Sequence, residues 1–396
     1  MKWASAISER HTLQEAIDEA AFQALSDLGS GSPDLALIFI SSHYLEQFPR
    51  VPELVLDQLG APILLGCSAG GVIGGGHEVE LRPGLSLTVA HLPEVELVPF
   101  HLQDNDLPNM DASPQAWEEI VHTAAGKEPQ FVLLADPFSF PTERLVQGLD
   151  YAFPDSVKTG GLASGRQPQE GNILFLEKTV HRSGAVGIAL QGNIVIDTIV
   201  AQGCRPVGRL MRVTRCHQNL LVELDEQPAI QVLQELFNSL NEGDQDLARH
   251  SLFLGMAMDE LQDEFNQGDF LIRNILGKDP TTGALAVGEL PNEGQRVQFH
   301  LRDANTSGEE LEGLLERYAA DKVGGPDWGT LLFSCLGRGQ HLYGRPDYDT
   351  DLFRKWLGGI PLGGFFCNGE IGPVGETTFL HGYTSSFGLF RPRSTS

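Results

Sequence analysis

The chain has 396 residues, of which 41% are hydrophobic and 20% are charged. This balance is typical of a folded globular protein and excludes a largely disordered chain, and the length predicts two domains or one large composite domain. Asp and Glu number 53 against 27 Lys and Arg, which gives a formal charge of −26. Because such a charge repels phosphate backbones and anionic lipid, we expect no nucleic-acid partner and no membrane insertion.

The first predicted element is a helix that begins after Thr12. Thr12 and Glu15 have the spacing of a capping box, an apolar face follows, and Gly29 ends it. By the same signals we expect further helices to begin at Ser113 and Pro114, at Pro228, and at Ser307 with Glu310.

Three short apolar runs, at residues 35–40, 131–135 and 331–335, are predicted to be strands. Because these runs are continuous rather than alternating, both faces of each strand should be buried under other layers. Residues 250–302 show a different pattern, with apolar runs separated by turn residues, and this predicts antiparallel strands.

A weak internal repeat organises the chain. Three times a predicted strand is followed by a short helix and then by a second strand that ends in a glycine-rich turn. The turns begin at Gly66, Gly160 and Gly363, which lie 31, 29 and 32 residues after the strand starts. A single turn of this kind is ordinarily a tight connection, but three at equivalent places indicate duplication and predict that the turns line one pocket.

The predicted fold is therefore α/β, with layered sheets covered by helices. One form of it is a four-layer α-β-β-α arrangement built from duplicated β-α-β units.

The first turn also carries candidate nucleophiles. Residues 66–70 match the pattern G-x-S-x-G, but the helix that should follow the serine is interrupted by glycines, so a serine hydrolase is only an alternative. Cys67 is a second candidate, with His381 as its base, although a small buried cysteine is the commoner case. A hydrolase or transferase that uses Cys67 or Ser68 is thus the enzymatic alternative.

A denser group of polar residues lies near the C-terminus. A thiol, an amide, a carboxylate, an imidazole and a hydroxyl occur within a short span and could hold both ends of a small polar molecule. They are Cys367, Asn368, Glu370, His381 and Thr384. The alternative is a network that satisfies buried strand ends.

Other signatures are missing from the sequence. The histidines are scattered without metal-ligand spacing, and neither the phosphate-loop pattern nor G-x-G-x-x-G occurs. We therefore predict no metal, no cofactor and no assigned catalytic residue. Glu9 and Arg10 stand where a signal peptide needs its apolar segment, and the five cysteines form no C-x-x-C pair, which together predict a cytoplasmic protein.

Several segments together resemble the FIST family. They are residues 3–6, 66–71, 268–275, 297–303, 369–373 and 380–384. The resemblance implies a FIST N-like domain over 1–205 and a FIST C-like domain over 206–396. It further implies a sensory module of signal transduction, which in some relatives is joined to F-box, chemotaxis or cyclase-type output domains. Because no such output domain is visible here, a separate signalling protein is the expected partner.

The leading hypothesis is a sensor that binds a small ligand, such as an amino acid, without performing chemistry. Glu370 would recognise a positive group, and main-chain N–H groups near Cys67 and Ser68 would hold a carboxylate. A protein-interaction scaffold, in line with F-box relatives, is the second alternative. The expected ligand-binding residues are Gly66, Cys67, Ser68, Gly70, Gly161, Cys367, Asn368, Glu370, His381 and Thr384.

Overall fold

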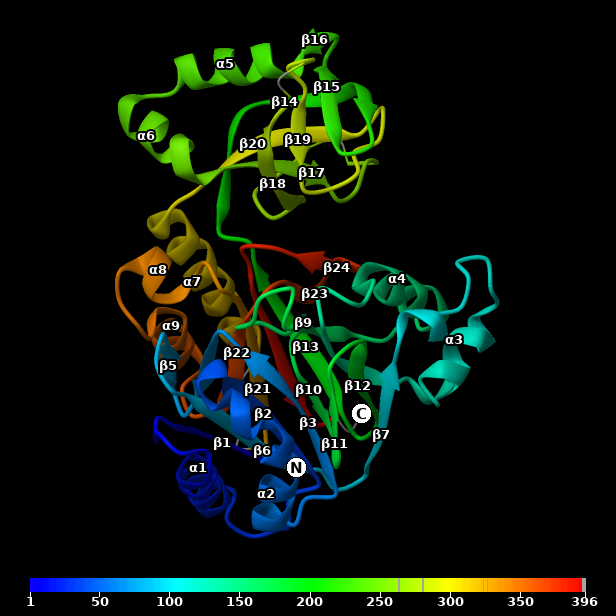
Figure 1. Cartoon of the computed structure of the whole chain (residues 1–396), viewed down its shortest axis with the longest axis vertical. Helices are drawn as coiled ribbons and strands as arrows, with labels where there is room; N and C mark the ends of the chain where they lie inside the picture. Colours follow the sequence, from blue (N-terminus) through cyan, green and yellow to red (C-terminus); the bar gives the residue numbers. More distant parts are fainter. Residues whose placement is uncertain (263, 280, 323, 326, 394–396) are drawn as a thin grey trace. The chain divides into compact units, whose positions relative to one another are not determined.

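The computed structural model describes residues 1–396 except 263, 280, 323, 326 and 394–396 (Figure 1). The chain forms two compact units. The first comprises Met1–Val200, Glu312–Leu380 and Thr384–Ser396, and the second comprises Ala201–Leu311 with His381–Tyr383. Along the sequence, the second unit is therefore an insertion into the first.

Over the described residues, the first unit contains three six-stranded sheets. The first sheet has the order β1 (Lys2–Ser8), β6 (Leu85–His91), β2 (Leu35–Ser41), β3 (Ile63–Ala69), β10 (Leu174–Leu176) and β11 (Thr179–His181). The second has the order β24 (Thr377–His381), β23 (Glu370–Val374), β9 (Lys158–Leu162), β8 (Gln130–Ala135), β12 (Ala185–Gly192) and β7 (Val95–Leu102). The third has the order β13 (Val195–Ala201), β25 (Ser385–Arg391), β21 (Gly329–Cys335), β22 (Leu362–Cys367), β4 (Gly71–Gly74) and β5 (His77–Glu80).

The three sheets share one plan. Each has a parallel pair at its centre, namely β2 with β3, β8 with β9, and β21 with β22. An antiparallel strand flanks the first member of each pair, and the start of a hairpin flanks the second. The three strand–helix–strand units expected from the sequence are therefore confirmed.

Each repeat gives its hairpin to another sheet. The chain leaves β3 of the first sheet and forms the β4–β5 hairpin in the third. In the same way β10–β11 follows β9 of the second sheet but joins the first, and β23–β24 follows β22 of the third but joins the second. The exchange is cyclic, and the chain crosses between sheets at the glycine-rich turns.

Helices cover the outer faces of these sheets. α1 (Leu13–Leu28), η1 (Ser42–Arg50) and α2 (Val51–Leu59) pack on the first sheet. α3 (Pro114–Ile120) and α4 (Thr142–Ala152) pack on the second, whose repeat also contains η2 (Asp104–Asp106) and η3 (Ala125–Lys127). The third repeat contains α7 (Ala304–Asp321), α8 (Gly339–Tyr343) and α9 (Tyr348–Leu357), and Phe353 of α9 stacks on Phe387 of β25.

The structure contains the helices that the sequence predicts, and one of them begins at another residue than expected. The Thr12 side chain accepts the Glu15 N–H at 3.3 Å, and Gly29 ends α1 with a φ of 70°, which confirms the predicted helix. The expected start at Ser307 is wrong, because α7 begins at Ala304. Asp303 occupies the capping position instead, and its carboxylate accepts the Thr306 N–H at 2.8 Å.

The inner faces of all three sheets meet in one hydrophobic core. Phe39 of β2, Val132 of β8, and Phe333 and Phe365 of β21 and β22 belong to this cluster, and the Phe39 and Phe365 rings stack 4.6 Å apart. The layered α/β class is therefore confirmed. The layering consists of three helix-covered sheets around a common core, one sheet more than an α-β-β-α arrangement has.

The second unit has its own core and a seven-stranded sheet. Its order is β14 (Cys204–His217), β20 (Arg296–Arg302), β17 (Leu252–Ala257), β18 (Phe270–Lys278), β19 (Leu285–Val287), β15 (Leu220–Leu224) and β16 (Gln227–Pro228). The antiparallel strands expected over 250–302 are confirmed, with β20 returning to pair with β17. α5 (Ala229–Ser239) and α6 (Glu242–Ser251) accompany this sheet.

Within the described ranges, none of the helices has both the length and the hydropathy that crossing a bilayer requires.

Two edge strands of the first unit carry a stacked histidine pair. The rings of His101 on β7 and His181 on β11 lie 3.7 Å apart between centroids. Burial, and then the neighbouring His101, lower the pKa of His181 to about 4. The folded protein therefore resists protonation of a ring that the unfolded chain protonates near pH 6.5.

We expect this histidine pair to make the first unit acid-sensitive. Above about pH 6.5 the His181 ring is neutral in both the folded and the unfolded state, and the free energy of unfolding keeps its full value. As the pH falls toward 4, the unfolded state binds a proton that the folded state does not, so the free energy of unfolding falls. His181→Gln should lower the dependence of the urea midpoint on pH between 7 and 5, whereas His11→Gln, at an exposed position, should not. Equal pH dependence in the wild type and His181→Gln would contradict the prediction.

Candidate functional site

The three glycine-rich turns meet inside the first unit. Ser164 of the second turn donates its N–H to the Ser68 carbonyl at 3.1 Å. Its hydroxyl donates to the Phe366 carbonyl at 2.5 Å and accepts the Gly70 N–H at 2.8 Å. One serine thus joins turns that come from all three repeats, which confirms that the turns converge, whereas the common pocket that they were expected to line stays a prediction. We call this meeting point, formed by residues 66–71, 160–165 and 363–370, the turn junction.

The second and third turns are joined by a further pair of main-chain bonds. Leu162 donates its N–H to the Gly369 carbonyl at 2.8 Å, and Asn368 donates its N–H to the Leu162 carbonyl at 3.0 Å. Much of the main chain at the junction therefore bonds to another turn. These bonds follow from the cyclic exchange of hairpins, because each turn crosses to the neighbouring sheet at this point.

Gly66 has a structural equivalent in each of the other repeats. Gly66, Gly160 and Gly364 stand opposite Ile38, Leu133 and Leu332 in their parallel strand pairs. A Cβ added at these glycines would lie 2.1, 1.9 and 1.9 Å from the carbonyl oxygens of those three partners. The recurrence shows that glycine is required here to let the paired strands approach.

Part of the junction reaches the surface. Gly165 and Asn368 are exposed, and Gly70 is half-buried. A Cβ added at Gly70 would lie 2.4 Å from Leu336 Cδ2 and 3.6 Å from the Gly165 nitrogen. This accessible edge therefore brings together Gly70, Gly165 and Leu336, one residue from each repeat. Asn368 also contacts the second turn, with its amide nitrogen 3.4 Å from the Ala163 carbonyl oxygen.

Cys67 and Ser68 lie below this edge and are fully buried. Burial raises the pKa of the Cys67 thiol well above its ordinary value, which opposes formation of a nucleophilic thiolate. The Ser68 hydroxyl accepts the Ile173 N–H at 3.1 Å and lies 3.3 Å from Asn172 Oδ1. Both side chains therefore have structural surroundings, and this geometry does not favour a nucleophile at either position.

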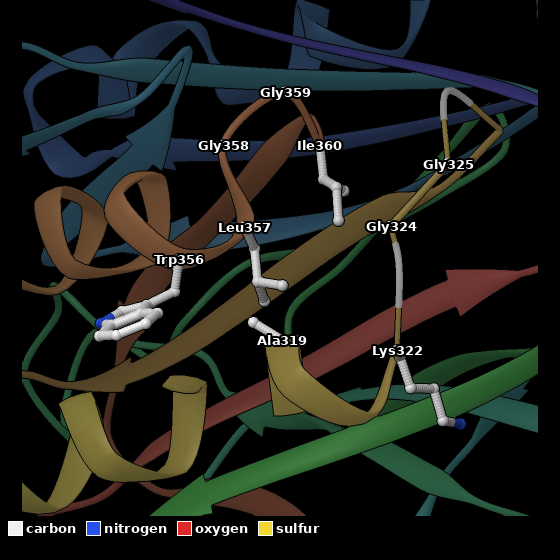
Figure 2. A pocket seen from close by; sticks show the side chains of 9 residues that line it. All are labelled: Ala319, Lys322, Gly324, Gly325, Trp356, Leu357, Gly358, Gly359 and Ile360. Carbon is white, nitrogen blue, oxygen red and sulfur yellow. The ribbon is translucent and has the colours of Figure 1, made fainter. Parts of the chain in front are cut away.

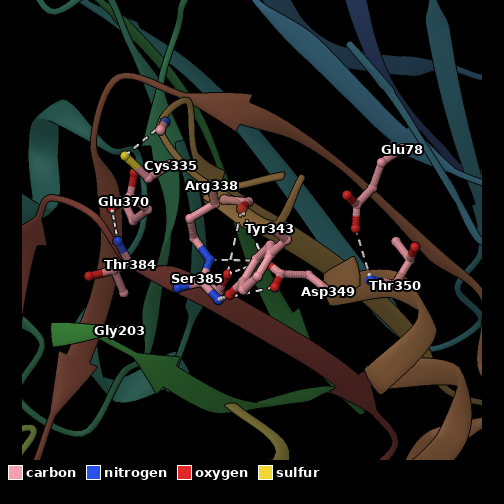
Figure 3. Close-up of polar contacts among 12 residues, drawn as sticks. Glu78, Gly203, Cys335, Arg338, Tyr343, Asp349, Thr350, Glu370, Thr384 and Ser385 are labelled. Carbon is pink, nitrogen blue, oxygen red and sulfur yellow. Dashed lines mark hydrogen bonds and ion pairs between the residues drawn. The ribbon is translucent and has the colours of Figure 1, made fainter. Parts of the chain in front are cut away.

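The C-terminal group contains a buried carboxylate. Glu370 Oε2 accepts the Thr384 N–H at 3.0 Å (Figure 3). Glu370 Oε1 lies 3.4 Å from Cys367 Sγ. Burial, followed by the Glu370 charge, raises the pKa of Cys367 well above its usual value. Gly161 faces this cysteine, because an added Cβ would lie 3.1 Å from Cys367 Sγ. The structure thus brings Gly161, Cys367, Glu370 and Thr384 together.

His381 is the last residue of β24 and is buried, but it groups with the second compact unit. The other nine expected ligand-binding residues lie in the first unit.

A buried ion pair beside the junction was missed by the sequence analysis. Arg338 donates two hydrogen bonds of 3.0 Å to Asp349, and both side chains are almost completely buried (Figure 3). Ser385 donates to the same carboxylate at 2.6 Å, and Arg338 also donates to the Tyr343 hydroxyl at 2.5 Å. The available signal was the position of Arg338, which follows β21 at its carboxyl end, where sites on open α/β sheets form.

A second buried carboxylate, Glu78 of β5, lies close to this pair. Its Oε1 accepts the Thr350 N–H at 2.9 Å, while Oε2 has no hydrogen-bond partner among the residues described. Burial and then the negative charge of Asp349 raise the pKa of Glu78 to about 8. The cluster therefore contains one carboxyl group, that of Glu78, which is readily protonated near neutral pH.

Three cavities of the first unit lie outside the junction's polar groups. One of about 450 Å³ lies between the end of α7 and the end of α9, and Figure 2 shows Trp356, Leu357 and Lys322 around it. A second cavity has a volume of about 470 Å³. Residues 358–360 line both the first and the second cavity. A third of about 540 Å³ is lined by Leu162 of the second turn and by the start of α4.

The fold and the junction define an α/β protein of three exchanged repeats with an antiparallel insertion. The FIST N domain model matches residues 34–227, and the FIST C domain model matches residues 229–373. The chain belongs to the FIST family, whose domains are associated with sensory signal transduction. The division into 1–205 and 206–396 stays a prediction.

Two mycobacterial relatives span nearly the whole chain. An uncharacterized protein of Mycobacterium tuberculosis, Rv0628c, is 35% identical over 97% of this chain and 98% of its own length. Another, Mb0898c of Mycobacterium bovis, is 34% identical over 95% of each chain. Human F-box only protein 22 is 36% identical over 85 residues, which is 20% of this chain and 21% of that protein. A solved cyanuric acid hydrolase of A. caulinodans covers 99% of the chain with a TM-score of 0.31 and 7% identity, which supports no inference.

Proposed function

We propose that this FIST protein is a sensory module that binds a small polar metabolite at the accessible edge of the turn junction. The observation that carries the proposal is that Gly70, Gly165 and Leu336, one residue from each repeat, meet where the junction is exposed. Gly165 is exposed and has no side chain, so its main chain is accessible to a ligand at this edge. Binding there would bridge the three repeats and bias their packing, which is the property that a sensor needs.

An amino acid is the proposed ligand class. Glu370 is buried and stands two positions after the exposed Asn368 in the chain. The negative charge of its carboxylate favours a ligand with a cationic group. The exposed Asn368 amide is suited to the ligand's carboxylate, whereas the Ser68 and Gly70 N–H groups already donate to the Ile173 carbonyl and the Ser164 hydroxyl at 2.8 Å each. The proposed partner is a separate signalling protein. The likeness to F-box only protein 22 covers too little of either chain to identify that partner. None of the five cysteines, all of which the structure describes, forms a disulfide, which supports a reducing, cytoplasmic location.

A thermal-shift panel of amino acids and common metabolites tests this proposal. A ligand at about 100 times its dissociation constant should add about 2.7 kcal/mol to the free energy of unfolding and raise Tm measurably. Asn368→Ala should weaken that stabilisation, and Glu370→Gln should weaken it for cationic ligands only.

Asn105→Ala, at another exposed asparagine of the first unit, is the matched control and should respond as the wild type does. The proposal fails if no compound stabilises the wild type. It also fails if a compound that stabilises the wild type stabilises both Asn368→Ala and Glu370→Gln by the same amount as the wild type.

A further inference from the structure

The cavity of about 540 Å³ at the start of α4 has the composition of a small-molecule site. Its walls are apolar, from Met110, Phe140, Leu162 and Leu380, and Thr142 and Arg144 add polar groups. The volume is in the range that binds small ligands. All of these residues belong to the first unit.

The position of the cavity in the fold favours ligand binding. β8 ends at Ala135 and β9 ends at Leu162, and these two strands are parallel neighbours. The cavity therefore lies beyond the carboxyl ends of a parallel pair, which is where open α/β sheets hold their ligands. α4 has 11 residues and begins at the cavity with Pro141 in the capping position, where no side chain caps it.

Thr142 supplies an independent sign of a missing ligand. Its side chain is 4% exposed and lines the cavity. Its Oγ1 has no hydrogen-bond partner in the part of the chain that the structure describes. A buried hydroxyl without a partner costs free energy, so a rotation about χ1 that turns the hydroxyl toward a ligand in the cavity would be favoured.

The charges around the cavity indicate the sign of that group. The start of α4 carries the positive end of the helix dipole. Arg144 lines the cavity, and its guanidinium donates to the Leu107 and Pro108 carbonyl oxygens at 3.0 and 2.7 Å. The exposed Glu143 also lines it, and Asp104 lies 3.7 Å from Arg144, so a second negative group on the ligand would be repelled. A single negative charge fits.

The third sheet shows what occupies the corresponding place when it is filled. The β4–β5 and β23–β24 hairpins match, with turn glycines Gly75 and Gly375 at φ 57° and 62°. Five residues beyond each glycine stand Glu80 and Leu380. The Glu80 carboxylate accepts the Gln340 N–H in the first turn of α8 at 2.8 Å. In the second sheet the matching strand brings Leu380 instead, and the cavity remains.

We propose that this cavity binds a small organic monocarboxylate. The carboxylate accepts from the Thr142 hydroxyl at the start of α4, beside Arg144, and the apolar body packs against Phe140, Leu162 and Leu380. The site is separate from the accessible edge of the turn junction and does not depend on the function proposed there.

Calorimetric titration with hexanoate, hexanamide and hexylamine tests the ligand class on the full chain. Hexanoate should bind at least tenfold more tightly than the neutral amide, and the amine should not bind, because only the carboxylate satisfies both the helix dipole and Arg144. The absence of hexanoate binding, or equal binding of hexanoate and hexanamide, would overturn the proposal.

Substitutions at the cavity locate the binding. Thr142→Val keeps the shape and should weaken hexanoate binding about tenfold. Leu380→Glu copies Glu80 of the third sheet and should abolish binding, whereas its uncharged control Leu380→Gln should retain it. Unchanged hexanoate affinity in both Thr142→Val and Leu380→Glu would place the ligand elsewhere and overturn the proposal. Asn368→Ala should leave hexanoate binding intact, which separates this result from the test of the turn junction.

Discussion

Gly160→Ala is expected to lower the free energy of unfolding by at least about 3 kcal/mol or to prevent folding. The added Cβ would lie 1.9 Å from the Leu133 carbonyl oxygen, and Gly160 has a φ of 157°. Neither partner can move easily, because both belong to the paired strands β8 and β9 at the centre of the second sheet. Urea denaturation of the purified variant would measure the loss.

Gly364→Ala should behave in the same way, because its added Cβ would lie 1.9 Å from the Leu332 carbonyl oxygen. Gly126→Ala is the matched control, since nothing lies within 4 Å of an added Cβ at that exposed position. Wild-type stability in both Gly160→Ala and Gly364→Ala would show that these glycines are not required by the strand pairing.

The repeat could be predicted from the sequence because its signals are local. Continuous apolar runs at 35–40, 131–135 and 331–335 mark buried strands, and the glycines mark the turns that follow. The cyclic exchange of hairpins could not be predicted in this way. Whether the strand after Gly70 pairs with its own sheet or with another depends on contacts with β22, far along the chain, and no local pattern encodes that choice.

The convergence of the turns was predicted, but the chemistry of the junction was predicted less well. Sequence alone does not show that Ser68 and Cys67 are buried, or that the Ser68 hydroxyl bonds to the Ile173 N–H. Arg338 and Asp349 were missed because charged residues in a polar stretch of sequence ordinarily indicate a solvated surface. Only the folded chain shows that both charges are enclosed.

The three repeats keep one backbone plan and differ in what they place beside it. The glycine opposite the first parallel strand recurs in all three, as Gly66, Gly160 and Gly364. The third repeat adds a buried ion pair, the second leaves an uncapped helix start, and the first contributes buried Cys67 and Ser68. Structural residues thus repeat while polar residues diverge, which is expected if the repeats share a scaffold and have separate roles at the site.

Asp349→Asn is expected to destabilise the first unit by about 3–5 kcal/mol, because it leaves the Arg338 guanidinium buried without a counter-charge. Burial alone would raise the pKa of Asp349, but Arg338, with the hydroxyls of Ser385 and Ser334, holds it below the ordinary value. A carboxyl group whose pKa is lowered on folding stabilises the protein above its unfolded pKa, near 4, and this contribution is lost as the pH falls further. Urea denaturation at pH 7 should therefore show the full difference, and the difference should shrink below pH 4.

Asp351→Asn, two residues along α9, provides the control. Asp351 pairs with Arg345 at 2.7 Å, but the two side chains are 34% and 49% exposed, so its loss should cost at most about 1 kcal/mol. In the double variant Arg338→Met with Asp349→Leu, neither charge remains to be desolvated, and much of the lost stability should return. If the double variant is less stable than Asp349→Asn by as much as the loss of Arg338 alone would cost, the two charges act separately. Similar stability of Asp349→Asn and Asp351→Asn would show that the buried pair does not hold α9 against the third sheet.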